Sequence, residues 1–241
     1  MSAGRSLLYG LVNLLHPRML WLMLWPTLVA LVLWGSVALA FWVRTALWLA
    51  GVLSRWLDAW SLLASLNVGD VTLVAANVLL FLAFVPLVYM TALFILGVFG
   101  MHAMVDHVAR RSFPALERRH GGGTLGSVWN AVVALIGMLA LAIATLPLWL
   151  VPPLWPLIPV AILGWGNQRL LRYDALAEHA DAAEMRRVFR GRRGALYLLG
   201  VLLALVAYIP LLGLLAPVWF ALGFIHYLLG ALELERRRAT L

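Results

Sequence analysis

One long stretch of this sequence, residues 71–101, contains no charged side chain. A helix of about 20 apolar residues crosses the hydrocarbon core of a bilayer, so this stretch is longer than a crossing requires. Residues 19–43 form a second such stretch, in which the polar residues are the uncharged Thr27 and Ser36. The two stretches predict transmembrane helices.

Composition agrees with a chain that is largely surrounded by lipid. Hydrophobic residues make up 64% of the chain and charged residues only 12%, whereas a soluble domain carries about 25% charged residues. All positively charged side chains belong to arginine, and the formal net charge is +8. Basic loops of membrane proteins fix topology and meet anionic headgroups, so we expect the lipid bilayer as a partner and no nucleic acid.

Two further segments have one apolar and one polar face at helical spacing. Residues 1–18 predict a short interfacial helix that leads into the first span, and residues 44–70 predict a helix that lies on the membrane. Both are therefore expected to be amphipathic interfacial helices.

Prolines break the two remaining apolar segments into helical hairpins. Residues 127–166 are interrupted at Pro152 and Pro153, and residues 195–232 at Pro210 and Pro217. The limbs of the second segment have about 15 residues, fewer than a spanning helix needs. Hairpins that penetrate partly are the economical interpretation, and six full crossings are the alternative.

The polar segments lie at residues 102–126 and 167–194 and hold most of the arginines. With both hairpins returning to their starting side, sixteen of the eighteen arginines share one side with both termini, opposite Arg44 and Arg55. The positive-inside rule makes that side cytoplasmic. The prediction is an all-α integral membrane protein, a single polytopic domain over residues 1–241, in the inner (plasma) membrane with cytoplasmic termini.

Short motifs over most of the chain resemble the CysZ-like sulfate transporter family, part of a superfamily named after an etoposide-induced protein. The amino-terminal motif includes Leu14, Leu15, Pro17, Arg18, Leu20, Trp25 and Pro26. Residues 169–173 are similar to the end of the family's first hairpin. Residues 194–200, residues 209–212 and Pro217 are similar to its last hairpin.

This resemblance implies two long spans, two partly penetrating hairpins and a homo-oligomer that passes sulfate inward. The sequence departs from the family pattern at two places. A Gly-Leu-Arg run expected before the first span is Pro17, Arg18 and Met19 here, and a polar residue expected between the last two prolines is Gly213.

Three residues are the candidates for an anion pathway. Arg18 directly precedes the first span and is placed to meet an anion, although anchoring at the headgroups is the commoner use of such an arginine. Asn77 and Asn130 lie in apolar segments, where an amide lines a pore or, more commonly, bonds a neighbouring helix.

Other kinds of site find little support. His102, Asp106 and His107 lie at helical spacing, but two histidines five residues apart point to different helix faces, so we expect a solvated helix end and no metal. Residues 121–123 are glycines without the lysine of a nucleotide-binding loop. The absence of cysteine removes thiolate catalysis, and no catalytic residue, enzyme activity or cofactor is expected.

The acids of residues 174–193 precede the arginines, which predicts a helix with internal ion pairs, or one that binds a partner or anionic lipid. No span has a charged residue or a histidine at its centre, which favours a channel-like route over a proton-relay pump. The functional prediction is a channel-like permease for a small oxyanion such as sulfate. The alternative is a structural or scaffolding membrane protein without transport activity.

Overall fold

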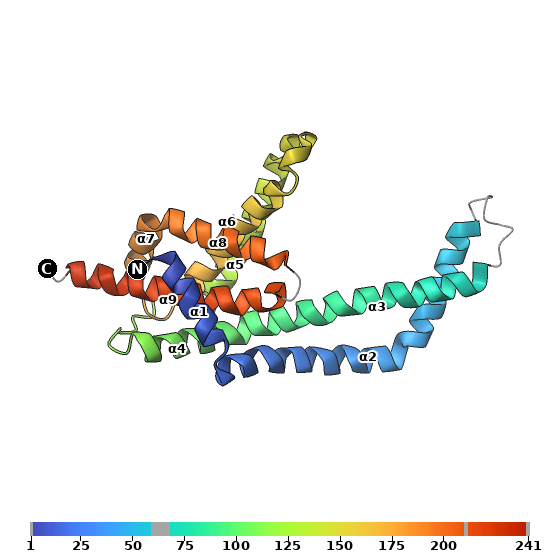
Figure 1. Cartoon of the computed structure of the whole chain (residues 1–241), viewed down its shortest axis with the longest axis horizontal. Coiled ribbons are helices and arrows are strands. Elements are labelled where there is room, and N and C mark those ends of the chain that lie inside the picture. Colours follow the sequence, from blue (N-terminus) through green and yellow to red (C-terminus); the bar gives the residue numbers. More distant parts are fainter. Residues whose placement is uncertain (1, 59–67, 210–211, 240–241) are drawn as a thin grey trace. The chain divides into compact units, whose positions relative to one another are not determined.

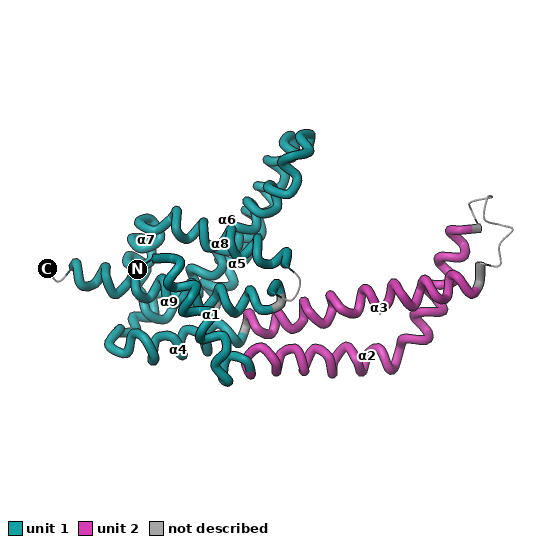
Figure 2. Tube along the Cα trace, viewed as in Figure 1, with its two compact units in different colours: residues 1–20, 99–241 teal, residues 21–98 magenta. Residues whose placement is uncertain are grey.

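The computed structural model describes residues 2–58, 68–209 and 212–239, and the regular elements in these ranges are helical. They form two compact units, unit 2 of residues 21–98 and unit 1 of residues 1–20 and 99–241 (Figure 2). The predicted all-helical fold class is confirmed. The residues expected to form a single domain are arranged in these two units.

Unit 2 is built from two long helices, α2 (Pro17–Asp58) and α3 (Val68–Ile95), which run in opposite directions (Figure 1). Tryptophan side chains bridge them. Trp34 Nε1 donates to Thr91 Oγ1 at 2.9 Å, and Trp42 Nε1 donates to Asn77 Oδ1 at 2.8 Å. These side-chain bonds fix the register of two helices that otherwise present apolar surface.

The two predicted spans fall within these long helical segments. The span expected at residues 71–101 continues from α3 through a π-helical turn, η1 (Leu96–Gly100). The segment expected as a separate interfacial helix, residues 44–70, is instead the continuation of α2 as far as Asp58, and residues 59–67 lie outside the described part. No proline follows Pro26 before Asp58, so the helix continues past Arg44, and its later part bends and passes across α3 in the view of Figure 1.

Apolar side chains of unit 2 point outward. Only 6% of the most apolar part of α3 is buried, and Phe94 is 72% exposed. Such a helix pair in water would expose far more apolar surface than a soluble protein tolerates. Lipid is the solvent that this surface fits.

The centre of unit 1 is the helix α9 (Leu212–Ala239), which other helices of the unit surround. In the most apolar part of α9, 78% of the residues are buried. Its fully buried side chains include Phe220, Phe224 and Leu228. The helices that pack against it are α1 (Ala3–Leu14), α4 (Met101–Ser112), α6 (Leu157–Leu176), α7 (Ala182–Gly191) and α8 (Arg193–Ala207).

The predicted interfacial helix at residues 1–18 is mainly α1, and one of its faces crosses α9 closely. At the crossing, a Cβ atom on Gly10 would lie 2.7 Å from the carbonyl oxygen of Trp219. Nearby, Tyr9 stacks on His226 with ring centroids 3.8 Å apart, and Trp219 Nε1 donates to the Leu7 carbonyl at 2.8 Å. The opposite face of α1 is apolar and exposed, with Val12 64% exposed, so the helix remains amphipathic.

The first predicted hairpin consists of α5 (Thr124–Ala144) and α6, which pack against each other (Figure 1). Its tip holds two short 3₁₀ helices, η2 (Leu146–Leu150) and η3 (Pro152–Leu154), so Pro152 and Pro153 lie at the tip. Trp155 Nε1 closes the tip by donating to the Trp149 carbonyl at 2.6 Å.

The second predicted hairpin consists of α8 and α9. Its tip residue Pro210 lies outside the described part of the chain. Pro217, also expected at the tip, lies inside α9 in the second turn. Pro217 is the sixth residue of α9, where proline lacks the amide hydrogen and its ring crowds the preceding turn, yet α9 continues through it.

The polar segments are also largely helical. The segment at residues 102–126 begins as α4, and the single helix expected over residues 174–193 is interrupted after Leu176. The interruption follows from a capping box, in which the Asp181 carboxylate accepts from the amide of Glu184 and Glu184 accepts from the amide of Asp181. This motif starts a new helix, α7.

Candidate functional site

Four basic side chains of unit 1 gather where α1 passes into α2. We call His16, Arg18, His107 and Arg111 the cationic cluster. The imidazole rings of His16 and His107 lie 5.0 Å apart. Burial lowers the pKa of His107, and the positive charges of His16, Arg111 and Arg18 lower it further.

The local sequence explains how α1 and α2 supply two members of the cluster. Pro17 begins α2, a position where its missing amide hydrogen costs nothing. The His16 carbonyl then accepts from the amide of Met19 at 2.8 Å, and His16 Nδ1 accepts from the amide of Arg18 at 3.3 Å. In the neutral form of His16 this bond places the proton on Nε2, which can donate to a ligand, and Arg18 is exposed.

α4 supplies the other two members, because His107 and Arg111 are four residues apart and share a helix face. His107 is partly buried, and its Nε2 atom is fully buried with no hydrogen-bond partner in the described residues. A buried imidazole nitrogen without a partner costs free energy unless something bonds to it.

The carboxylate next in sequence to His107 is already paired elsewhere. Asp106 Oδ1 accepts from Arg118 at 2.6 Å and from Arg110 at 3.0 Å. Burial raises the pKa of Asp106, but these two arginines outweigh that effect and hold its pKa below the ordinary value. Arg18 and Arg111 therefore leave the cluster with an excess of positive charge, and an oxyanion is the ligand that such donors fit.

The three residues predicted for a pathway lie in different surroundings. Arg18 belongs to the cationic cluster in unit 1. Asn130, also in unit 1, donates to the Arg169 carbonyl at 3.0 Å and so joins α5 to α6. Asn77 belongs to unit 2, where it accepts from Trp42 and donates to the Leu73 carbonyl at 2.8 Å. Both asparagines thus make the interhelical bonds that were considered as their alternative use.

Of the other cluster residues, His16 and Arg111 were not identified from the sequence, and His107 was considered for a different kind of site. His107 was weighed as a metal ligand, together with His102 and Asp106. The described residues contain no group of three or more His, Asp or Glu side chains placed to hold a metal ion. The signal for an anion site was the four-residue spacing of His107 and Arg111, but their proximity to His16 depends on tertiary packing.

A buried carboxylate ties three arginine-rich segments of unit 1 together. Glu184 of α7, with its side chain only 3% exposed, accepts from Arg119 at 2.9 Å and from Arg236 of α9 at 2.9 Å. Burial raises its pKa, but the bonds from Arg236 and the Asp181 amide outweigh burial, and its pKa is lowered overall. The ionised Glu184 therefore brings the basic ends of α4–α5, α7 and α9 to one place.

Comparison with known proteins adds one match. A family model described as sulfate transporter CysZ/etoposide-induced protein 2.4 matches residues 6–217. This range includes all four residues of the cationic cluster. No curated protein and no solved structure matches the chain.

Proposed function

Because the chain belongs to the family of sulfate transporter CysZ and etoposide-induced protein 2.4, we propose that it is a channel-like permease for a small oxyanion such as sulfate. It is a multi-pass helical membrane protein, with four helices long and apolar enough to cross a bilayer. The proposal adds to this class a substrate, a small oxyanion, and a route by which it crosses the membrane.

The observation that carries the proposal is the cationic cluster. His16, Arg18 and Arg111 lie near enough to His107 for their charges to lower its pKa, and the buried His107 Nε2 atom has no partner in the described residues. Oxyanions accept several hydrogen bonds at once, and charge-assisted bonds from arginine are the strongest of these. Arg18 precedes the first span, so an anion bound here would be at the mouth of the membrane segment.

The route is passive in this proposal and lies in a homo-oligomer in the inner membrane, with both termini cytoplasmic. The expected spans contain no Asp, Glu, His, Lys or Arg at their centres, the residues on which proton relays depend. Sixteen of the eighteen arginines belong to unit 1, and Glu184 gathers several of their segments, which supports a common cytoplasmic side. We propose no enzymatic activity and no cofactor.

A scaffolding role without transport is the second candidate, and the asparagines favour it. Asn77 and Asn130 bond neighbouring helices, as amides do in ordinary transmembrane packing. If the remaining polar groups behave in the same way, no continuous hydrated path crosses the protein.

Uptake of radiolabelled sulfate into proteoliposomes tests the proposal. We expect saturable uptake that exceeds that of empty liposomes. Arg18→Ala and Arg111→Ala should each reduce uptake at low sulfate by roughly tenfold, the value of one charge-assisted bond. Arg5→Ala removes an exposed arginine of α1 outside the cluster and should leave uptake unchanged.

Two results would count against the proposal in different ways. Background uptake of sulfate, phosphate and chloride by folded, oriented protein would reject transport and favour the scaffold. If sulfate uptake is saturable but its rate is the same in Arg18→Ala, Arg111→Ala and Arg5→Ala, the protein transports sulfate and the cationic cluster takes no part in the pathway.

A further inference from the structure

A second basic site lies on unit 1 between α7, the start of α8 and the end of α9. It is a pocket of about 270 Å³. This is just below the roughly 300 Å³ at which pockets for drug-sized ligands begin, so it suits a small group. The cationic cluster and this pocket share no residue.

The lining of the pocket combines an apolar floor with a charged rim. Val188 and Ala231 are buried, and Leu234 adds an exposed apolar edge. Three arginines and one glutamate provide the charge: Arg187, Arg192, Arg238 and Glu235. Three positive charges minus one negative charge leave an excess of two.

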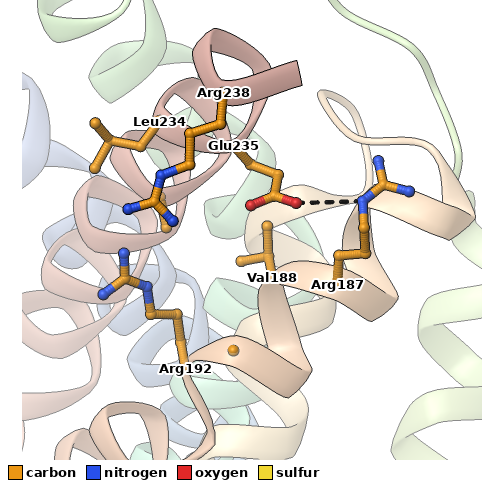
Figure 3. Close-up of a pocket in the computed structure, with 8 residues that line it drawn as sticks. Arg187, Val188, Arg192, Leu234, Glu235 and Arg238 are labelled. Carbon is orange, nitrogen blue, oxygen red and sulfur yellow. Dashed lines mark ion pairs between the residues drawn. The ribbon is translucent and has the colours of Figure 1, made fainter. Parts of the chain in front are cut away.

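The glutamate is committed to one of the three arginines. Glu235 Oε1 lies 3.3 Å from Arg187 Nε, and its carboxylate turns toward Arg187 (Figure 3). The guanidinium groups of Arg192 and Arg238 instead face each other across the pocket (Figure 3). In the part of the chain that the structure describes, no carboxylate pairs with either of them.

Two facing guanidinium groups repel each other, and an anion between them removes that repulsion. Arg192 is also the residue that precedes α8, and no side chain caps this helix start. α7 ends at Gly191, so the partial charges of the two helix ends at Arg192 offset each other, and the positive charge of the pocket comes from the guanidinium groups. A phosphate group presents pairs of oxygens that guanidinium forks bind. At pH 7 inorganic phosphate carries about −1.5 to −2 charges, and the diester of a phospholipid headgroup carries about −1.

We propose that the pocket between α7 and α9 binds a phosphate group. Two sources supply this chemistry, the headgroup of an anionic phospholipid and free phosphate. The exposed edge at Leu234 is compatible with the glycerol and first acyl carbons of a lipid, whereas free phosphate needs only the arginines. The site is independent of the proposed sulfate route.

Binding to the purified full chain in detergent tests the proposal and separates the two sources. Native mass spectrometry measures bound short-chain phosphatidylglycerol, with phosphatidylcholine as the zwitterionic reference. Calorimetry measures inorganic phosphate. If a lipid is the source, phosphatidylglycerol binds and phosphate does not displace it, and if free phosphate is the source, phosphate binds without lipid.

Variants show whether binding occurs in this pocket. Arg192→Ala and Arg238→Ala should each weaken binding by roughly tenfold. Arg186→Ala is the matched control, because it removes an exposed arginine next to Arg187 that does not line the pocket. Glu235→Gln should tighten binding by roughly threefold, a gain that misfolding cannot produce.

The proposal is overturned if neither probe binds the native chain. It is also overturned if Arg186→Ala weakens binding as much as Arg192→Ala and Arg238→Ala do, since binding would then follow general surface charge. Circular dichroism of each variant confirms that helical content is kept.

Discussion

At the scale of single residues, His107 connects proton binding with anion binding. Burial and the charges of His16, Arg111 and Arg18 lower its pKa, whereas the charge of Asp106 raises it. An oxyanion beside the ring would add negative charge and raise the pKa again. By linkage, the protonated ring must then bind the oxyanion more tightly than the neutral ring does.

We therefore expect sulfate uptake at low sulfate to increase as pH falls below the ordinary histidine pKa of about 6.5. Without an anion the effect on stability has the opposite sign. The folded-state pKa is lowered, so stability is present above the unfolded pKa and is lost as pH falls through the folded value. Sulfate should restore part of that loss in thermal unfolding at low pH.

His107→Gln should flatten the pH dependence of uptake. His102→Gln removes an exposed histidine of the same helix, α4, and serves as the control. An unchanged pH profile in His107→Gln would show that another group titrates.

Residue-scale features were the least predictable from the sequence. The acids and arginines of residues 174–193 suggested pairs within one helix, yet Glu184 pairs with Arg119 and Arg236, and Arg187 pairs with Glu235. Arg236 lies far from Glu184 along the chain and approaches it only because α7 packs on α9. Local spacing contains no information about such tertiary pairs.

At the scale of elements, the sequence predicted helices better than their surroundings. Apolar length identified α3 and the first part of α2, and the proline breaks identified the hairpin of α5 and α6. Apolar length did not distinguish α3, whose apolar side chains are exposed, from α9, whose apolar side chains are mostly buried by other helices. Lipid and protein are both apolar solvents for a side chain, so composition is similar in the two cases.

The crossing of α1 and α9 depends on a residue without a side chain. We expect Gly10→Ala to destabilise unit 1 by about 1–3 kcal/mol, because its Cβ would lie 2.7 Å from the Trp219 carbonyl oxygen and 3.0 Å from the Gly223 amide nitrogen. Backbone atoms of a packed helix cannot move aside as a flexible side chain can. Thermal unfolding in detergent, followed by circular dichroism, measures the loss.

Gly4→Ala provides the matched control in the same helix. A Cβ there meets nothing within 4 Å, so the better helix propensity of alanine should leave stability unchanged or raise it by up to about 1 kcal/mol. Equal effects of the two substitutions would contradict the close approach of α1 to α9.

At the scale of the whole molecule, membrane topology depends on how far the hairpins reach. α8 has 15 residues, which at 1.5 Å per residue span about 22 Å. The hydrocarbon core is about 30 Å thick. A helix of this length that starts beside the arginines of α7 ends inside the bilayer, where an irregular tip must be covered by protein or face a watery cavity.

Single introduced cysteines test this depth, because the native chain has none. With a membrane-impermeant maleimide, Ala115→Cys should react only from the cytoplasmic side and Arg55→Cys only from the opposite side. Tyr208→Cys, at the end of α8, should react from neither side until detergent is added, since a thiol in an apolar setting is not ionised and does not react. Tyr208 is 60% exposed within the chain itself, so its protection must come from lipid or from another subunit. Reaction of Tyr208→Cys from the side that labels Arg55→Cys would instead establish that the second hairpin crosses fully, as the topology of six spans requires.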